Sequence, residues 1–133
     1  MRIVGAVAIV WGMGTFQKFR AWDACFALTL EVYRVTGSWP KAEMYGLTSQ
    51  ARRAAVSTGA NIAEGSAKRG SAEFGRFLDI VLGSLSELEH LLLVARALGF
   101  LHQEDWQSAE TKRIDAARLT YALYRAVRPP RPP

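Results

Sequence analysis

The sequence predicts an all-α fold, an antiparallel four-helix bundle with up-down-up-down topology. Apolar residues recur at spacings of three and four throughout the chain, and no alternating pattern of the kind that marks strands persists. Half of the 133 residues are apolar, which suffices for one buried core without disulfides. Three short connections separate four such periodic stretches, and short connections favour antiparallel neighbours.

The first helix is expected from Gln17 to Thr36, with a regular row of large apolar residues facing the core. This row comprises Phe19, Trp22, Phe26, Leu30 and Tyr33. Gly37 stands at the position where a glycine commonly terminates a helix. Pro40 suits the first turn of the next helix, because its ring fixes φ and a first turn does not need its missing donor.

The second helix is expected from Ala42 to Glu64 and contains a row of small residues. They recur every four positions, at Ala51, Ala55, Gly59 and Ala63. Small side chains let a neighbouring backbone approach closely. Because a mid-helix glycine costs about 1 kcal/mol relative to alanine, we expect tight packing at Gly59 to compensate. A ligand cavity is the alternative use of such a row.

The third and fourth helices have recognisable ends. The third is expected to begin with Ser71 as its N-cap and to end at Leu98. Gly99 followed by Phe100 is typical of a Schellman end, in which a left-handed glycine is followed by a hydrophobic contact. The fourth helix is expected from Gln103 to Val127, with acidic residues in its first turn and basic residues in its last, which suits the helix dipole.

The two ends of the chain differ from its middle. Residues 1–14 are largely apolar but too short to span a bilayer, which takes about 20 apolar residues, and no convincing cleavage site follows. We expect them to be a disordered extension or the product of a start codon assigned too far upstream. The bundle then occupies residues 15–128, and the proline-rich tail at 129–133 is expected to be disordered.

Cys25 is the single cysteine of the chain. An internal disulfide is therefore impossible, which fits a reducing compartment and predicts a cytoplasmic location. The apolar neighbours Phe26 and Leu28 favour a small buried side chain over a reactive thiol.

The net charge of +5 is distributed unevenly along the chain. Residues 1–70 contain nine lysines and arginines against four acids, residues 71–110 contain two against seven, and residues 111–133 contain six against one. Two basic blocks thus flank an acidic block. This layout suits a polyanionic partner or electrostatic self-assembly, although ordinary solvated helix faces produce similar runs.

Motifs for catalysis or metal binding are largely missing from the sequence. Glu87-x-x-His90 is half of the pattern with which some four-helix bundles hold two metal ions. His102 lacks a matching glutamate, so the second half is missing. A phosphate loop, a dinucleotide fingerprint and a nucleophile elbow are also absent. We therefore expect no metal, no cofactor and no enzymatic activity.

One polar stripe lies on a single side of the second helix. It comprises Arg53, Ser57, Asn61 and Glu64. A solvated face is the usual interpretation of such a stripe. Alternatively, Asn61 and Glu64 face the third helix, where Glu73 or Arg76 would be the partners. A polar network of this kind would fix the register of the two helices, and this structural role is favoured over a catalytic one.

Two motifs, Tyr-Gly-Leu-Thr-Ser-Gln at residues 45–50 and Asn-Ile-Ala-Glu-Gly at residues 61–65, make the chain resemble a known family. It is similar to the four-helix-bundle proteins encoded by intervening sequences in bacterial 23S ribosomal RNA genes, over about residues 16–101. The resemblance implies a bundle that assembles into a ring, typically a pentamer. The accessory protein of diversity-generating retroelements is similar in fold, and there a basic ring surface engages nucleic acid and a reverse transcriptase.

Charge and resemblance together predict a non-catalytic, ring-forming protein that binds RNA or DNA phosphates through a basic surface. The predicted contacts are Arg52, Arg53, Lys68, Arg69, Lys112, Arg113 and Arg118. Either of the first two, in the middle of its helix, could instead pair with Glu87 or Glu89. The alternative function is a structural or protein-interaction module that holds a partner protein without binding nucleic acid.

Overall fold

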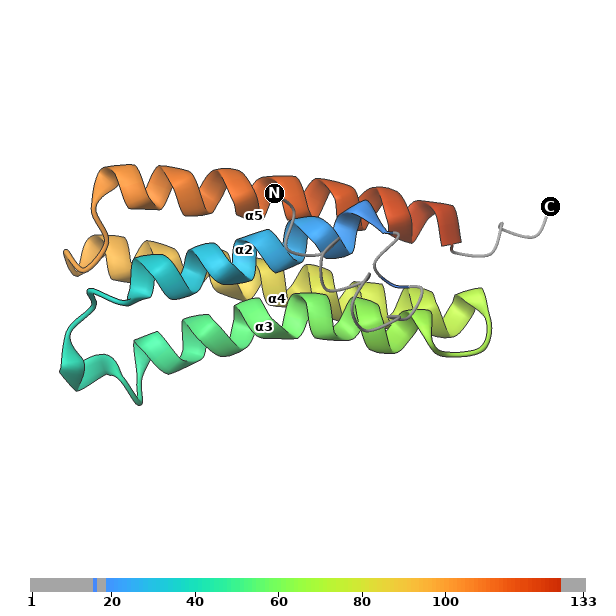
Figure 1. Ribbon diagram of the computed structural model, residues 1–133, viewed down its shortest axis with the longest axis horizontal. Helices are drawn as coiled ribbons and strands as arrows, with labels where there is room; N and C mark the ends of the chain where they lie inside the picture. Colours follow the sequence, from blue (N-terminus) through green and yellow to red (C-terminus); the bar gives the residue numbers. More distant parts are fainter. Residues whose placement is uncertain (1–15, 17–18, 128–133) are drawn as a thin grey trace, which may run out of the picture.

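The computed structural model describes residue 16 and residues 19–127, which form four long helices (Figure 1). The helices are α2 (Arg20–Thr36), α3 (Leu47–Ser66), α4 (Ser71–Ala97) and α5 (Gln103–Val127), with a short 3-10 helix η2 (Lys41–Glu43) before α3. The N-terminal extension at 1–14 and the proline-rich tail at 129–133 lie outside the described residues, so the expectations about them stay predictions.

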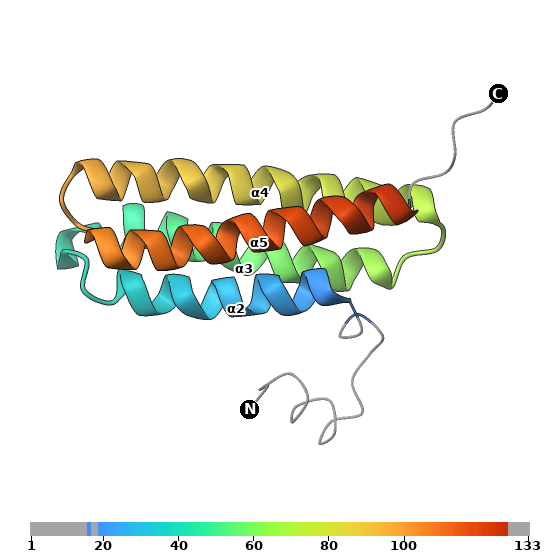
Figure 2. The same ribbon diagram turned by 90° about the horizontal axis from the view of Figure 1, so that it is seen from above.

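Successive helices run in opposite directions, as Figures 1 and 2 show, which confirms the predicted bundle. Each helix packs on the helices before and after it in the sequence, and α5 closes the bundle against α2. Consequently α2 lies diagonally across from α4, and α3 from α5. The start of α2, the α3–α4 turn and the end of α5 meet at one end of the bundle (Figure 1). None of the described helices is both long and apolar enough to cross a membrane.

The predicted start of the second helix is wrong. Pro40 does begin a turn, but this turn is the 3-10 helix η2, and α3 starts only at Leu47. The carboxylate of Glu43 explains the break, because its Oε2 accepts a hydrogen bond of 3.0 Å from the backbone N–H of Leu47. An acid that satisfies a first-turn donor favours a helix start at that point. The other helices have ends within a few residues of the prediction.

The predicted Schellman end of α4 is confirmed. Gly99 has a φ of 80°, in the left-handed region that favours glycine. Its N–H donates to the carbonyl of Arg96 at 3.1 Å, and the N–H of Phe100 donates to the carbonyl of Ala95 at 2.9 Å. These two bonds satisfy carbonyls that the end of a helix leaves without a partner.

Two other helix ends differ from expectation. Gly37 ends α2 in the right-handed region, with a φ of −61°, so no left-handed glycine is needed there. Ser71 is the first residue of α4 and not its N-cap, because Gly70 takes the cap position with a φ of 90°. No side-chain hydrogen bond caps this end, so the turn depends on a glycine rather than on a serine hydroxyl.

The row of small residues in α3 packs closely at Gly59, as predicted, and the neighbour there is α2. Ala51 and Ala55 are fully buried. A Cβ atom added at Gly59 would lie 3.3 Å from Nε1 of Trp22, so the glycine lets the indole approach the α3 backbone. Cys25 is also fully buried, and burial raises the pKa of its thiol, which keeps it protonated.

The proposed polar network between α3 and α4 is only partly present: the charge of Glu64 acts on Arg76, but Asn61 has its partner within its own helix. The amide nitrogen of Asn61 donates to the carbonyl of Ser57 within α3 at 2.7 Å. Glu73 pairs with Arg76 on its own helix, with 3.2 Å between Oε1 and Nε. A hydrogen bond of 2.7 Å between the hydroxyls of Ser57 and Ser84 also links the two helices.

Candidate nucleic-acid interface

The seven basic residues predicted to contact nucleic acid do not form one surface. They divide into a pair in the first half of α3, a pair in the α3–α4 turn and a set on α5, which lies diagonally across from α3. These groups are Arg52 and Arg53; Lys68 and Arg69; and Lys112, Arg113 and Arg118. Each group has its own set of acidic neighbours, and these neighbours decide whether its charges are available.

Arg113 belongs to the interior of the bundle, with only 8 % of its surface exposed. Its Nε donates to Glu110 at 2.8 Å, and its terminal nitrogen donates both to Glu110 and to Glu89 on α4. The hydrogen bond with Glu110 is the main cause that raises the pKa of this guanidinium. Arg113 is therefore a buried link between α5 and α4, and the prediction that it contacts phosphate is wrong.

Lys112 is likewise held by an acid from another helix. Its Nζ lies 3.1 Å from Oε2 of Glu31 on α2, and Glu31 also accepts a hydrogen bond of 2.7 Å from Nε of Arg34. Burial raises the pKa of Glu31, but the hydrogen bonds and positive charges of Arg34 and Lys112 outweigh burial and place the pKa below its usual value. Lys112 thus neutralises a carboxylate that is only 9 % exposed.

Arg118 is an intermediate case. Its guanidinium is 2.6 Å from Oδ1 of Asp115, three residues earlier on α5, but its side chain is 75 % exposed. An exposed pair of this kind contributes little, because solvent screens it and side-chain entropy opposes it. The pair of Arg118 and Asp115 nevertheless carries no net charge.

The two arginines of α3 have no ion pair with any described residue. Nε of Arg52 donates to the hydroxyl of Thr36 at 2.9 Å, and the Arg52 guanidinium lies 4.7 Å from the ring centroid of Tyr33. Arg53 is exposed. The alternative in which these arginines pair with Glu87 or Glu89 is not realised in the described part of the chain, since Glu89 binds Arg113.

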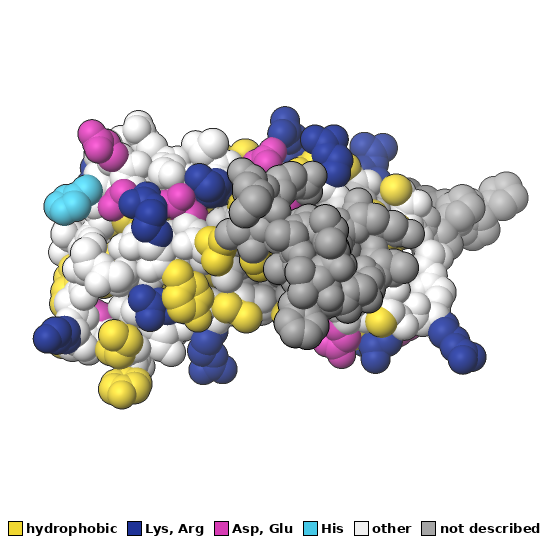
Figure 3. Space-filling model, in the orientation of Figure 1, with side chains coloured by type: hydrophobic (Ala, Val, Ile, Leu, Met, Phe, Trp, Pro, Cys, Tyr) yellow, Lys and Arg dark blue, Asp and Glu magenta, His cyan; other side chains and the backbone are white. Residues whose placement is uncertain are grey.

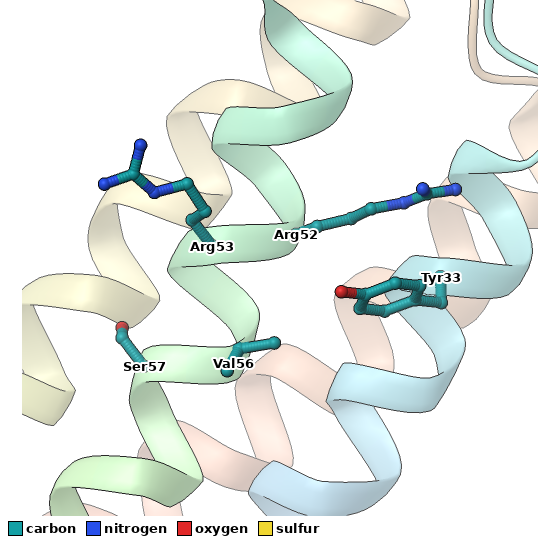
Figure 4. A pocket seen from close by; sticks show the side chains of 5 residues that line it. All are labelled: Tyr33, Arg52, Arg53, Val56 and Ser57. Carbon is teal, nitrogen blue, oxygen red and sulfur yellow. The ribbon is translucent and has the colours of Figure 1, made fainter. Parts of the chain in front are cut away.

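These residues line an open cavity of about 380 Å³ between α2 and α3, which we call the arginine groove (Figure 4). Its lining comprises Tyr33, Arg52, Arg53, Val56 and Ser57. Figure 4 shows Arg52 extending across the groove to α2, over Tyr33, whereas Arg53 points away from Tyr33 toward α4. Arg53 also borders a neighbouring cavity that Glu87 of α4 lines. The two side chains therefore leave α3 in directions that differ by about a quarter turn around the helix axis.

Tyr33 is a functional candidate that sequence reasoning placed in the core. The buried row of α2 consists instead of Cys25, Leu28, Val32 and Val35, and Tyr33 is 46 % exposed. The sequence does contain this second apolar row, which also recurs at spacings of three and four. A helix that buries it turns Tyr33 outward. In Figure 3, basic and hydrophobic side chains lie next to one another over the left half of this face.

A second basic region, which we call the basic end, forms where α2 begins, α3 turns into α4 and α5 ends. It contains Arg20, Lys68, Arg69, Arg76 and Arg125. Lys68 lies 4.0 Å from Glu64, and Arg76 pairs with Glu73. The other three have no ion pair with a described residue. Arg20 and Arg125 were missed by the sequence analysis, although the predicted antiparallel topology already brings them to this end.

No group of three or more histidine, cysteine or acidic side chains in the described part of the chain is arranged to hold a metal ion. Glu87 and His90 are both exposed on α4. The site thus presents cations that have no acidic partner among the described residues, next to the exposed ring of Tyr33.

Comparison with known proteins identifies the family. The chain is similar in fold to a solved structure of a protein of unknown function from the S23 ribosomal protein family of Bacteroides thetaiotaomicron. The two share 19 % sequence identity with a TM-score of 0.72, over 79 % of this chain and 95 % of the other, a likeness that shows the fold alone. None of the curated proteins compared with the chain matches it. The model of the 23S rRNA-intervening sequence proteins matches residues 17–122, most of the chain and all of the arginine groove, so the chain belongs to this family.

Proposed function

We propose that this protein is a non-catalytic, nucleic-acid-binding bundle whose free cations bind the phosphates of RNA or DNA. The observation that carries the proposal is the arginine groove, where two adjacent accessible arginines have no acidic partner among the described residues. An unneutralised guanidinium attracts phosphate, and the release of condensed counterions then drives binding.

The basic end lies further along α3 and offers a second group of cations. Arg53 stands 13 residues before the last residue of α3, so about 20 Å of helix separates the arginine groove from the α3–α4 turn. A polyanion laid along α3 would reach both regions. The proposed contacts are therefore Arg52, Arg53, Lys68, Arg69, Arg20 and Arg125, and the cations of α5 that face acids are left out.

We also propose that the protein forms a homo-oligomer in the cytoplasm, with a pentameric ring as the expected state. The support comes from exposed large apolar residues on the outer faces of α4 and α5, namely Ile80, Leu93, Ile114 and Tyr121. Ile114 and Tyr121 are seven residues apart and share one side of α5, and exposed apolar residues on one side of a helix are typical of an association face. Light scattering coupled to size exclusion tests this part, and a strictly monomeric mass at micromolar concentration would contradict it.

Fluorescence anisotropy with a labelled RNA strand and a labelled duplex, over a range of salt concentrations, tests nucleic-acid binding. Affinity should fall steeply as salt increases, with little dependence on base sequence. Replacing both groove arginines (Arg52→Gln with Arg53→Gln) should reduce the slope of log affinity against log salt by about two, because each lost phosphate contact reduces it by about one.

Arg118→Gln is the matched control, because it removes one exposed positive charge from the helix diagonal to α3. It should leave the salt slope close to that of the unmodified protein. If neither probe binds even at low salt, the nucleic-acid proposal is wrong.

The second candidate function is a protein-interaction module, and one observation favours it. Tyr45 is 98 % exposed beside the exposed Met44, in the connection between η2 and α3. Leu98 is also exposed at the α4–α5 connection, which lies at the same end of the bundle (Figure 1). This function predicts that Tyr45→Ser abolishes association with a partner protein, while the salt-dependent binding of nucleic acid is absent.

A further inference from the structure

We propose that Tyr33 and Arg52 form a stacking platform for an unpaired base, so that the arginine groove selects single-stranded over double-stranded nucleic acid. This inference rests on the proposed function, since it specifies the class of nucleic acid that the groove takes. It adds a contact to the base, whereas the arginines alone would contact only phosphates.

The platform is preorganised by a buried anchor. The hydroxyl of Thr36, which is buried at the end of α2, donates to the carbonyl of Val32 at 2.7 Å and accepts from Nε of Arg52 at 2.9 Å. This bond holds the Arg52 guanidinium 4.7 Å from the Tyr33 ring centroid. Because the guanidinium lies over the ring, a base would stack on the guanidinium plane that Tyr33 supports from below, and a planar cation held in this way loses little further entropy when a base stacks on it.

The surroundings of the platform suit a nucleotide. Val56 is exposed and adds apolar surface to the cavity beside Tyr33 (Figure 4). Arg53 borders the same cavity with no acidic partner among the described residues and is available for an adjoining phosphate. The cavity of about 380 Å³ falls within the range of about 300–1,000 Å³ that is usual for small-molecule sites.

Only an unpaired strand exposes the face of a base, which is the surface that this platform binds. In a duplex, each base is stacked on its neighbours and paired, so that proteins reach its edges but not its face. Aromatic rings and guanidinium planes are the surfaces on which splayed-out bases stack, with little preference for sequence. A groove with phosphate-binding arginines alone would hold both kinds of strand, but one that also stacks a base favours the single strand.

The test compares three labelled probes of equal length: a mixed-sequence single strand, its duplex and an abasic single strand that keeps the phosphates but lacks bases. The unmodified protein should bind the single strand about tenfold more tightly than the abasic strand, because one stacked base contributes an effect of that order. Tyr33→Leu should remove this difference without weakening binding to the abasic strand or the duplex. Tyr33→Phe, which keeps the ring, should retain it.

Tyr45→Leu is the control, since Tyr45 is also an exposed tyrosine, at 98 %, but lies in the connection between η2 and α3, outside the lining of the arginine groove. It should change none of the three affinities, and thermal melts should show that every variant is folded. The stacking inference is overturned if Tyr33→Leu binds the single strand as tightly as the unmodified protein, or if it weakens all three probes equally. Failure of the proposed function looks different, because none of the probes then binds the unmodified protein at low salt.

Discussion

Two basic pairs of this bundle look alike in sequence and differ completely in structure. Arg52 and Arg53 in α3 carry no ion pair with a described residue, whereas Lys112 and Arg113 in α5 both bind carboxylates. The reason is the supply of acids. The only acid in α3 is Glu64, eleven residues after Arg53, whereas α5 contains four acids of its own and receives others from α2 and α4.

The difference shows that a basic run does not by itself indicate a binding surface. A cation near the core faces acids on neighbouring helices, because an unpaired charge there would be costly to bury. A cation on an outer edge has no such requirement and stays available to a polyanion. In this protein the α5 pair is therefore engaged within the fold, and the α3 pair is the proposed binding surface.

The largest expected effect is on stability. Arg113→Met should lower the free energy of unfolding by roughly 2–3 kcal/mol, because it leaves the largely buried carboxylate of Glu110 without its partner. Arg53→Met should change it by less than about 0.5 kcal/mol, as is usual for exposed positions. Urea denaturation monitored by circular dichroism measures both. Equal losses for the two variants would mean that the pairs do not differ in role.

The second prediction concerns Glu31, the acid that holds Lys112. Glu31→Gln should destabilise the protein by about 1 kcal/mol at neutral pH, because charged hydrogen bonds are lost. The pKa of Glu31 in the folded protein lies below its ordinary value of 4.5, so its contribution is present above that pH and is lost as the pH falls through the lower folded value. The difference in stability between the two proteins should therefore shrink on acidification, as denaturation series at pH 7 and pH 3 will show.

A third variant makes the α3 pair resemble the α5 pair. Gln50 stands three residues before Arg53, the same spacing as Glu110 before Arg113, and it lines the cavity beside Arg53. Gln50→Glu should lower the affinity for a labelled RNA strand about threefold, because the new carboxylate competes with phosphate for Arg53. The effect is this small because an exposed ion pair contributes little free energy. Gln50→Asn is the uncharged control and should bind as the unmodified protein does.

The smallest expected effect runs in the opposite direction. Glu87 borders the same cavity as Arg53 and repels a polyanion that approaches it. Glu87→Gln should therefore raise the affinity about twofold at low salt, a difference that vanishes at high salt because exposed charges are screened. An unchanged or weaker affinity in anisotropy titrations at low salt would indicate that nucleic acid does not approach this side of Arg53.

The helices were predictable because apolar periodicity and turn residues act locally. The left-handed Gly99 and the close contact at Gly59 follow from residue type alone. The start of α3 did not follow, since it depends on one carboxylate, that of Glu43, which bonds the Leu47 backbone and ends the preceding turn. The site was harder, because whether Arg52 or Arg113 is free depends on acids that approach from other helices. Local sequence does not place these acids.

The central claim is that the α3 arginines, which have no acidic partner among the described residues, bind nucleic acid, whereas Arg113 is engaged by carboxylates within the fold. Modification of arginines by a dicarbonyl reagent, followed residue by residue with mass spectrometry, tests it directly with and without a saturating RNA strand. We predict that Arg53 reacts quickly alone and is protected by RNA, that Arg113 reacts slowly in both samples, and that Arg118 is unaffected by RNA. Rapid modification of Arg113, or an Arg53 rate that RNA does not change, would contradict the claim.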